Sequence, residues 1–223
     1  MSKILESPNV LIAAGGTRES IDDVRYIGNF SGGALGHALA EQYANFYCEE
    51  DKVALLSPKS VPDRYGHLWD VNHENYTDAQ SLQTSILSRN GVNLILHAAA
   101  VADYTPKPTI GKISSDQDEL IIRLKKVPKI LPMLRKHFGK HTTIVGFKLL
   151  SNVPEDKLIA VARKQILDCN TDYCIANDLQ DISTNSRKIH IVDSSGDYMT
   201  YEGDTKYIAK KIVENIPIGN NYE

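Results

Sequence analysis

The chain has 223 residues and a formal net charge of −3, and its basic residues are scattered, so it lacks the positive stripe that nucleic-acid backbones require. Its N-terminus lacks the charged-then-apolar pattern of a signal peptide, and no apolar run approaches the ~20 residues of a membrane span. We therefore expect a single cytoplasmic domain over residues 1–223, with no nucleic acid and no membrane among its partners.

Short β-rich runs alternate with helical patterns along most of the chain. This alternation favours parallel strands joined by crossover helices, because such elements pack as the layers of one α/β domain. We predict a Rossmann-like, doubly wound three-layer sandwich with a mostly parallel sheet. The expected strands are 10–14, 52–57, 92–98, 142–147 and 172–177, and the expected helices are 35–47, 78–89, 128–137 and 154–167.

Three other stretches have their own character. Residues 188–193 and 198–202 flank a Ser-Ser-Gly-Asp turn, which predicts an antiparallel C-terminal hairpin, and a helix is expected at 205–214. Residues 216–223 are typical of a loose tail. Residues 104–118 hold two prolines and few apolar side chains, so we predict an exposed, mobile loop there.

Two glycine-rich turns carry the first functional signal. The first predicted strand runs into Gly15, Gly16 and Thr17, where backbone N–H groups could approach an anion without interference from a Cβ atom. This turn does not match the dinucleotide fingerprint, and no Walker A sequence occurs. A phosphate-binding turn and an ordinary strand-ending turn both fit the pattern.

The second glycine-rich turn, residues 29–36, directly precedes the first amphipathic helix. Its N–H groups and the positive end of the helix dipole would face the same strand ends, so two turns suited to anions would converge. In the alternative, Ser31 caps the helix and the glycines allow close packing.

The combined segment GGTRESIDDVRYIGNFSGG resembles phosphopantothenate-cysteine ligase, the stand-alone form. Further blocks follow in the family's order over about residues 9–180: AAVADY at 99–104, KISS at 112–115, LKKVPKIL at 124–131, GFKLL at 146–150 and IANDL at 175–179. Several rare strings in sequence are more specific than any one glycine motif.

The resemblance implies a ligase that joins 4′-phosphopantothenate to L-cysteine in coenzyme A biosynthesis. In such enzymes CTP or ATP activates the carboxylate as an acyl-nucleotide, pyrophosphate leaves, and cysteine displaces the nucleotide. It also implies Mg²⁺ with the nucleotide, a homodimer and no flavin. No metal ligand can be named from the sequence.

Two residues resemble the family's catalytic groups. Asn29 corresponds to the asparagine whose amide donates to the acyl carbonyl oxygen during cysteine attack. Lys112 corresponds to the lysine of an active-site flap, which closes over the α-phosphate. In the alternative without a catalytic role, Asn29 is an ordinary turn residue and Lys112 is a solvated surface lysine. We expect the loops that hold Asn29, Asp103 and Lys112 to gather at a common rim.

The remaining site residues are carried over as nucleotide or substrate contacts. Asp103 would accept from ribose hydroxyls or serve a turn, and Phe147 would line the base pocket or belong to the core. Asn177 and Asp178 could serve substrate or structure. The full set is Gly15, Gly16, Thr17, Ser31, Gly33, Ala99, Ala100, Asp103, Gly146, Phe147, Lys148, Asn177 and Asp178.

The sequence departs from the family pattern at Ala34, and two other functions are alternatives to the ligase. Most family members have Lys or Arg where this chain has Ala34, so a positive charge near the phosphates is missing and the choice between CTP and ATP stays open. A non-catalytic nucleotide-binding relative would also fit the motifs. An NAD(P)-dependent oxidoreductase would need the dinucleotide fingerprint, and it would bind NADH but no triphosphate.

Overall fold

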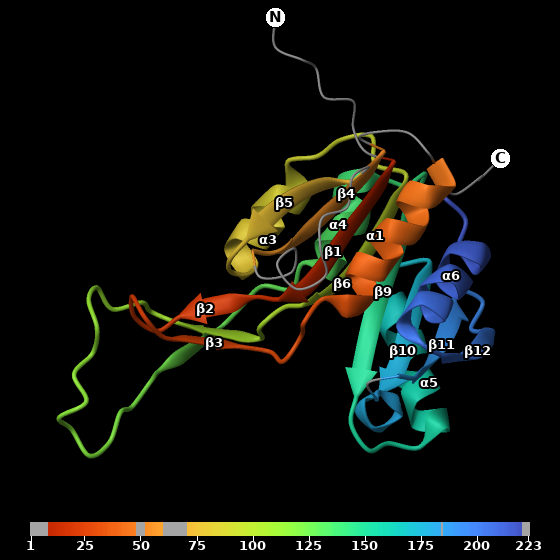
Figure 1. Ribbon diagram of the computed structural model, residues 1–223. Coiled ribbons are helices and arrows are strands. Elements are labelled where there is room, and N and C mark those ends of the chain that lie inside the picture. The colour runs from red at the N-terminus through yellow and green to blue at the C-terminus, as the bar shows by residue number, and fades with distance from the viewer. Residues whose placement is uncertain (1–8, 48–51, 60–70, 184, 220–223) are drawn as a thin grey trace, which may run out of the picture.

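The computed structural model describes residues 9–47, 52–59, 71–183 and 185–219. Within them, an eight-stranded sheet has the order β12-β11-β10-β9-β6-β1-β4-β5 (Figure 1). The six neighbouring strands β10, β9, β6, β1, β4 and β5 are parallel, whereas β11 and β12 form the predicted antiparallel hairpin. The bounds are β1 Val10–Gly16, β4 Val53–Pro58, β5 Asn72–Tyr76, β6 Leu94–Ala100, β9 Thr143–Leu150, β10 Tyr173–Asp178, β11 Arg187–Asp193 and β12 Tyr198–Gly203.

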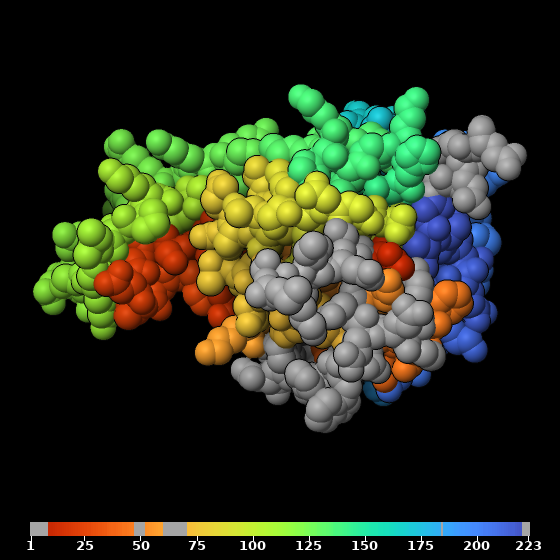
Figure 2. Space-filling view, turned by 90° about the horizontal axis from the view of Figure 1, so that it is seen from above, coloured from red at the N-terminus to blue at the C-terminus, as the bar shows by residue number. Residues whose placement is uncertain are grey.

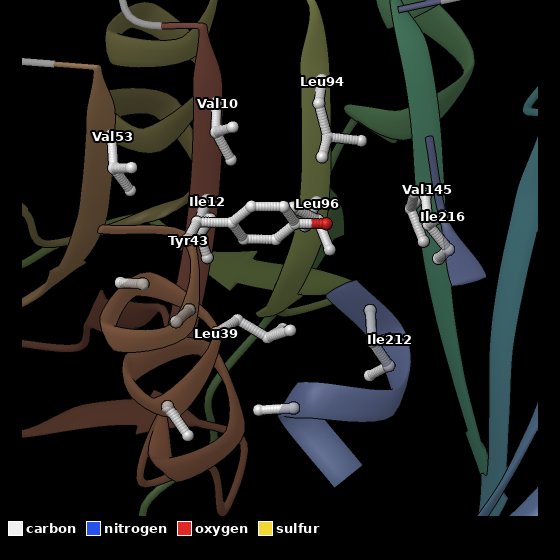
Figure 3. Close-up of a cluster of buried hydrophobic side chains, with 14 of the residues drawn as sticks. Val10, Ile12, Leu39, Tyr43, Val53, Leu94, Leu96, Val145, Ile212 and Ile216 are labelled. Atoms are coloured by element: carbon white, nitrogen blue, oxygen red, sulfur yellow. The ribbon is translucent and has the colours of Figure 1, made fainter. Parts of the chain in front are cut away.

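Helices cover both faces of this sheet. On one face, α1 and α6 bury a cluster that includes Leu39, Tyr43 and Ile212 against β1 and β6 (Figure 3). On the other face, α3 and α4 pack on β1, and α5 packs on β10. The three predicted layers are therefore confirmed. The bounds are α1 Ala34–Tyr47, α3 Ala79–Leu87, α4 Leu131–Phe138, α5 Glu155–Cys169 and α6 Thr205–Asn215, with a short 3-10 turn at Leu179–Asp181.

The strand order reverses between β1 and β6. Strand β1 pairs with β4 on one side and with β6 on the other, and the chain continues from the two strands in opposite directions across the sheet. In doubly wound folds, ligands bind outside the carboxyl ends of the strands at such a switch point. The carboxyl ends of β1 and β6 are the two glycine- and alanine-rich segments singled out in the sequence.

An arm projects from this edge of the sheet (Figures 1 and 2). It consists of two small antiparallel pairs with their loops, residues 18–28 and 104–126, and the two pairs lie side by side. The bounds are β2 Arg18–Ser20, β3 Tyr26–Gly28, β7 Tyr104–Pro106 and β8 Leu124–Lys126. The predicted loop 104–118 is therefore wrong at its start, because residues 104–106 form a strand.

Other boundaries also differ from the sequence prediction. Helix α4 begins at Leu131 rather than at Pro128, and Pro154 lies at the N-cap of α5, just before the helix. The predicted loose tail is wrong at its start, because Ile216 is 3% exposed and belongs to the core beneath α1 and α6. The amide of Gly219 also donates to the Asn93 carbonyl at 3.2 Å. Residues 220–223 lie outside the described part of the chain.

Candidate active site

The two glycine turns meet in close backbone contact. Gly16 pairs with Ala100 across β1 and β6, and a Cβ atom on Gly16 would lie only 2.7 Å from the Asn29 carbonyl oxygen. Because that contact is with backbone, a side chain at this position would displace the turn. The predicted convergence of the turns is thus a consequence of glycine at position 16.

Tyr76, which lies outside the sequence blocks that carry the resemblance, holds the first turn by hydrogen bonds to its backbone. The Tyr76 hydroxyl, at the end of β5, lies 2.8 Å from the Ala14 carbonyl oxygen and 3.0 Å from that of Gly15. Burial raises the pKa of Tyr76, so its hydroxyl keeps the proton that it donates. Gly15 adopts a φ of +86°, which favours glycine. Sequence reasoning missed Tyr76 because it follows a polar stretch.

Asn29 lies where the second turn crosses the end of β6. Its side-chain amide donates to the carbonyl oxygens of Ala100 at 3.3 Å and Val101 at 3.2 Å, and the residue is exposed. Both bonds are long for N–H···O contacts, so an incoming oxygen could replace one of the carbonyls as the acceptor of a hydrogen bond from this amide. Asn29 is thus available at the switch point for the role that the resemblance implies.

Thr17 follows β1 directly, and its side chain is buried. It is 1% exposed, and its hydroxyl oxygen accepts from the Ala102 amide at 3.0 Å. Its own amide donates to the Ala100 carbonyl at 3.3 Å. The side chain therefore joins the first turn to the residues that follow β6.

Helix α1 begins directly after the second turn. Gly33 has a φ of +77°, and its carbonyl oxygen accepts from the His37 amide at 3.0 Å, which closes the first turn of the helix. A Cβ atom on Gly36 would lie 2.2 Å from that of Ala14, so this glycine serves helix-to-strand packing. Ser31 and Gly33 therefore remain beside the positive end of the helix, as predicted, while the packing alternative holds for Gly36.

The sheet opens between β6 and β9 beyond one residue pair. The ladder between these strands ends at His97 and Gly146, whereas β9 stays paired with β10 as far as Leu150. Ala99 and Ala100, both partly buried, lie on the β6 side of this opening. These two positions are the ones at which the sequence predicts space for a ring.

The predicted base-pocket block on β9 lies inside the strand rather than at its end. A Cβ atom on Gly146 would lie 2.4 Å from the Gln165 side-chain nitrogen, so Gly146 serves the packing of α5. Phe147 is partly buried against the core beneath α1 and α6, which supports its core alternative. Lys148 is half-buried beside β10.

Asp103 stands just past the end of β6 and is exposed. Its carboxylate forms an ion pair with Lys129, and its carbonyl oxygen accepts from the Val127 amide at 2.9 Å. An exposed pair contributes little to stability, which leaves the carboxylate available to other donors. Lys129 was not predicted as a site residue, although it lies in one of the blocks that carried the resemblance.

The sequence left the roles of Asn177 and Asp178 open, and the structure gives these two residues different surroundings. The Asp178 carboxylate is buried and accepts from the backbone amides of Gln180, Asn152 and Val153 at 2.9 to 3.0 Å. These bonds, led by that from Gln180, hold the pKa of Asp178 below its usual value. Asp178 therefore fastens two loops to the end of β10, while Asn177 remains partly exposed.

Lys112 lies on the arm rather than beside Asn29. It is exposed, and its neighbours Gly111 and Ile113 bond to Asp23 and Asp22 at the tip of the β2–β3 hairpin. Gly28, directly before Asn29, stands at the opposite end of that hairpin. Asn29 thus contacts the chain two residues before Asp103, whereas Lys112 lies on the arm beside the hairpin tip, at the end of the hairpin away from Asn29.

His97 is a buried polar residue that sequence reasoning also missed. It is the last residue of β6 to pair with β9, and burial lowers its pKa to about 4. Its Nδ1 atom has no hydrogen-bond partner among the residues described. No sequence signal distinguishes this histidine from a satisfied core residue.

The fold and its site together define the class of protein. A doubly wound sheet has two glycine turns, a helix start and two alanines at its switch point, which is the arrangement of Rossmann-like α/β proteins. In the described part of the chain, no group of three or more His, Cys, Asp or Glu residues could hold a metal ion. Over the same residues, no helix is long and apolar enough to cross a membrane.

The chain belongs to the family described as DNA/pantothenate metabolism flavoprotein C-terminal domain, which matches residues 5–218. A relative from Methanocaldococcus jannaschii, named coenzyme A biosynthesis bifunctional protein CoaBC, is 34% identical over 95% of this chain and 51% of its own length. The protein of the same name from Thermococcus kodakarensis is 35% identical over 85% of this chain and 46% of its own length. The chain thus spans about half the length of these curated relatives.

Solved structures agree with this membership. The DNA/pantothenate metabolism flavoprotein from Streptococcus pneumoniae has a TM-score of 0.80 and 29% identity, over 93% of this chain and 97% of that one. The C-terminal domain of a CoaBC protein has a TM-score of 0.72 and 26% identity, over 96% and 95%. A mutant of Cab2 in complex with phosphopantothenate-cysteine has a TM-score of 0.71 at 21% identity, over 92% and 85%, which shows a shared fold.

Proposed function

We propose that the chain is a ligase that forms the amide between 4′-phosphopantothenate and L-cysteine in coenzyme A biosynthesis, with CTP or ATP as co-substrate. The family membership supports this proposal, as do relatives named for coenzyme A biosynthesis. The Cab2 complex adds a protein of the same fold that holds phosphopantothenate-cysteine, the product of such a reaction.

The reaction requires two substitutions in sequence. The carboxylate oxygen of phosphopantothenate attacks the α-phosphorus of the nucleotide, and the bond to the β-phosphate breaks to release pyrophosphate. The cysteine nitrogen then attacks the acyl carbon, the bond to the nucleoside monophosphate breaks, and the amine loses a proton. Because the reacting groups are anionic, the protein contributes mainly position and positive potential.

The observation that carries the proposal is the junction of Gly16, Asn29 and Ala100. It places a neutral amide, held by two long bonds to the end of β6, directly at the switch point. An amide N–H there can donate to the acyl oxygen as negative charge develops on it. Asn29 is accordingly our candidate for the second half-reaction.

We assign the nucleotide site to the neighbouring residues. Asp103 would accept from ribose hydroxyls, and Ala99 with Ala100 would leave space for the base. The start of α1, with Ser31 and Gly33, would face the phosphates, since N–H groups and the helix dipole favour negative charge there. Gly15 and Gly16 would bring backbone amides near the same phosphates.

We propose that Mg²⁺ enters with the nucleotide. Mg²⁺ in nucleotide sites is often held by phosphates and water with only one or two carboxylates. The described residues contain no group of three or more His, Cys, Asp or Glu side chains that could hold a metal ion. The ion would therefore depend on the phosphates for most of its ligands, where it would offset charge on the departing pyrophosphate.

We further propose a homodimer in which the arm reaches a second copy of the chain. Lys112 stands at the far end of the β2–β3 hairpin from Asn29, so it would have to serve a site other than its own. The arm also exposes large apolar side chains that a partner could cover, with exposed fractions from 43% to 98%: Val24, Tyr26, Tyr104, Ile110, Leu120, Ile121 and Leu124. A particle of one chain mass in sedimentation equilibrium would contradict this assembly.

The function is tested by measuring pyrophosphate. The purified chain is incubated with phosphopantothenate, Mg²⁺ and either CTP or ATP, and cysteine is added in a second step. We expect pyrophosphate release that needs phosphopantothenate, followed by the amide product only after cysteine. Binding of a triphosphate without release would instead favour the non-catalytic relative.

A further inference from the structure

Two loops of the arm are joined by bonds that converge on one carboxylate. The tip of the β2–β3 hairpin, residues 21–25, lies against residues 109–113 from the other half of the arm. The Asp22 side chain is fully buried there, with an exposed fraction of 0%. Its oxygens accept from the backbone amides of Val24 at 3.0 Å and Arg25 at 2.8 Å, and from the Arg25 guanidinium.

The same carboxylate reaches across to the second loop. The Ile113 amide donates to Asp22 Oδ2 at 3.1 Å, and Arg25 Nη2 donates to the Ile113 carbonyl oxygen at 2.9 Å. Asp22 and Arg25 therefore bind both polar groups of the Ile113 backbone. The Arg25 guanidinium, followed by the amides, holds the pKa of the Asp22 carboxyl well below its usual range, so it stays ionised.

A second set of bonds holds the other neighbour of Lys112. The Gly111 amide donates to Asp23 Oδ2 at 2.9 Å, and the Thr109 amide donates to the Ile21 carbonyl oxygen at 2.9 Å. Lys112 thus lies between two residues whose backbones are fixed by the same hairpin tip, while its own side chain is exposed. Although the segment has no regular secondary structure, it is not a free loop at this position.

We infer that Asp22 is a positioning residue for Lys112, which it serves by fixing the backbone on which the ammonium is presented. This inference rests on the proposed function, in which Lys112 stabilises charge on the α-phosphate. A lysine on a fixed backbone loses less conformational freedom when it meets its ligand than one on a mobile loop. Asp22 touches no reacting atom and acts through Ile113.

The test separates positioning from simple stabilisation of the arm. Asp22→Asn keeps the size of the side chain but replaces one acceptor oxygen with an NH₂ group and removes the charge. We expect pyrophosphate release to slow about 10- to 100-fold, because small displacements of a catalytic group have effects of that size. The second half-reaction, measured with synthetic acyl-nucleotide and cysteine, should keep its rate within about twofold.

Asp116→Asn is the matched control. Asp116 is an exposed aspartate of the same arm, and its carboxylate bonds only to Ser114 among the contacts described. This variant should release pyrophosphate at the wild-type rate. In the Asp22→Asn variant, the Ile113 amide should exchange its hydrogen faster, a readout that does not depend on activity.

A double variant completes the experiment. In a Lys112→Gln background, Asp22→Asn should slow pyrophosphate release no further, because the group that it positions is gone. Additive losses, or equal slowing of both half-reactions, would overturn the inference while leaving the proposed function intact. A wild-type chain that releases no pyrophosphate would overturn both.

Discussion

At the scale of single residues, Gly16 decides how closely the two turns of the site approach. The Asn29 carbonyl oxygen occupies the space where a Cβ atom would lie, 2.7 Å from that position. The Asn29 amide is in turn held by the carbonyl oxygens of Ala100 and Val101. A change at Gly16 therefore acts on Asn29 through the backbone.

Gly16→Ala should reduce turnover through the position of Asn29. We expect kcat for the second half-reaction to fall about 10- to 100-fold, because the amide would shift from the acyl oxygen. Gly139→Ala is the control: Gly139 has a φ of +79° and a ψ of −169°, a conformation that favours glycine, and open space around it, so the change should cost about 1 to 3 kcal/mol of stability without loss of turnover. Stopped-flow assays and urea unfolding measure the two effects, and equal turnover of Gly16→Ala and wild type would contradict this account.

Asp178→Asn should lower stability in a manner that depends on pH. The carboxylate has a lowered pKa in the folded chain, so its contribution is fully present above the ordinary aspartate pKa of about 4 and is lost as pH falls through the folded-state value. The asparagine would also set an NH₂ group against a backbone N–H. We expect a thermal midpoint a few degrees below wild type at neutral pH.

That gap in midpoint should narrow as the pH falls below about 4, because the wild-type carboxyl then takes up a proton. Differential scanning calorimetry of both proteins across this range checks the prediction. A gap that stays constant with pH would show that the charge of Asp178 has no part in fastening the loops.

The sequence could predict the position of a residue where that position depends only on the neighbouring residues in the chain. The glycine turns and Asn29 lie where their spacing placed them, because a turn after a buried strand is a local feature. Asp178 could not be assigned, since a carboxylate at a strand end suits substrate and backbone amides equally. Lys129 and His97 gave no signal, because their partners or lack of partners depend on distant segments.

At the scale of elements, strands with an apolar pattern or a clear hairpin turn were predicted, and polar strands without such a turn were not. The strands β1, β4, β6, β9 and β10 each bury at least half of their residues. Strand β5 lies at the edge of the sheet and reads Asn-His-Glu-Asn-Tyr, with one buried residue. The arm strands have three residues each and lie outside the core, so no hydrophobic period could reveal them.

The arm loop should be dispensable for folding but required for the reaction. None of residues 107–123 belongs to a buried core cluster. Replacing them with Asn-Gly would close β7 and β8 into a tight hairpin. We expect a thermal midpoint within about 4 °C of wild type, together with loss of pyrophosphate release.

Circular dichroism and the pyrophosphate assay measure these two outcomes. The second half-reaction in the shortened chain serves as the control, because Asn29 and its partners on β6 are retained. Collapse of the folded state on removal of the loop would contradict the separation of arm and core.

At the scale of the whole molecule, the sequence predicted the layers of the sandwich but not the distance between its two candidate catalytic residues. Motif order indicates that Asn29 and Lys112 serve one reaction, but it does not say whether they belong to one site in one chain. The hairpin β2–β3 separates them, and the exposed apolar side chains of the arm favour a partner. Two copies with exchanged arms would complete two sites.

Mixing two impaired variants tests this central claim most directly. Asn29→Asp and Lys112→Gln chains are combined in equal amounts, unfolded and refolded together, and assayed for amide formation. If each site takes Asn29 from one chain and Lys112 from the other, half of the dimers are mixed and one of their two sites is intact. The account predicts about a quarter of wild-type turnover, whereas activity no higher than that of the separate variants would contradict it.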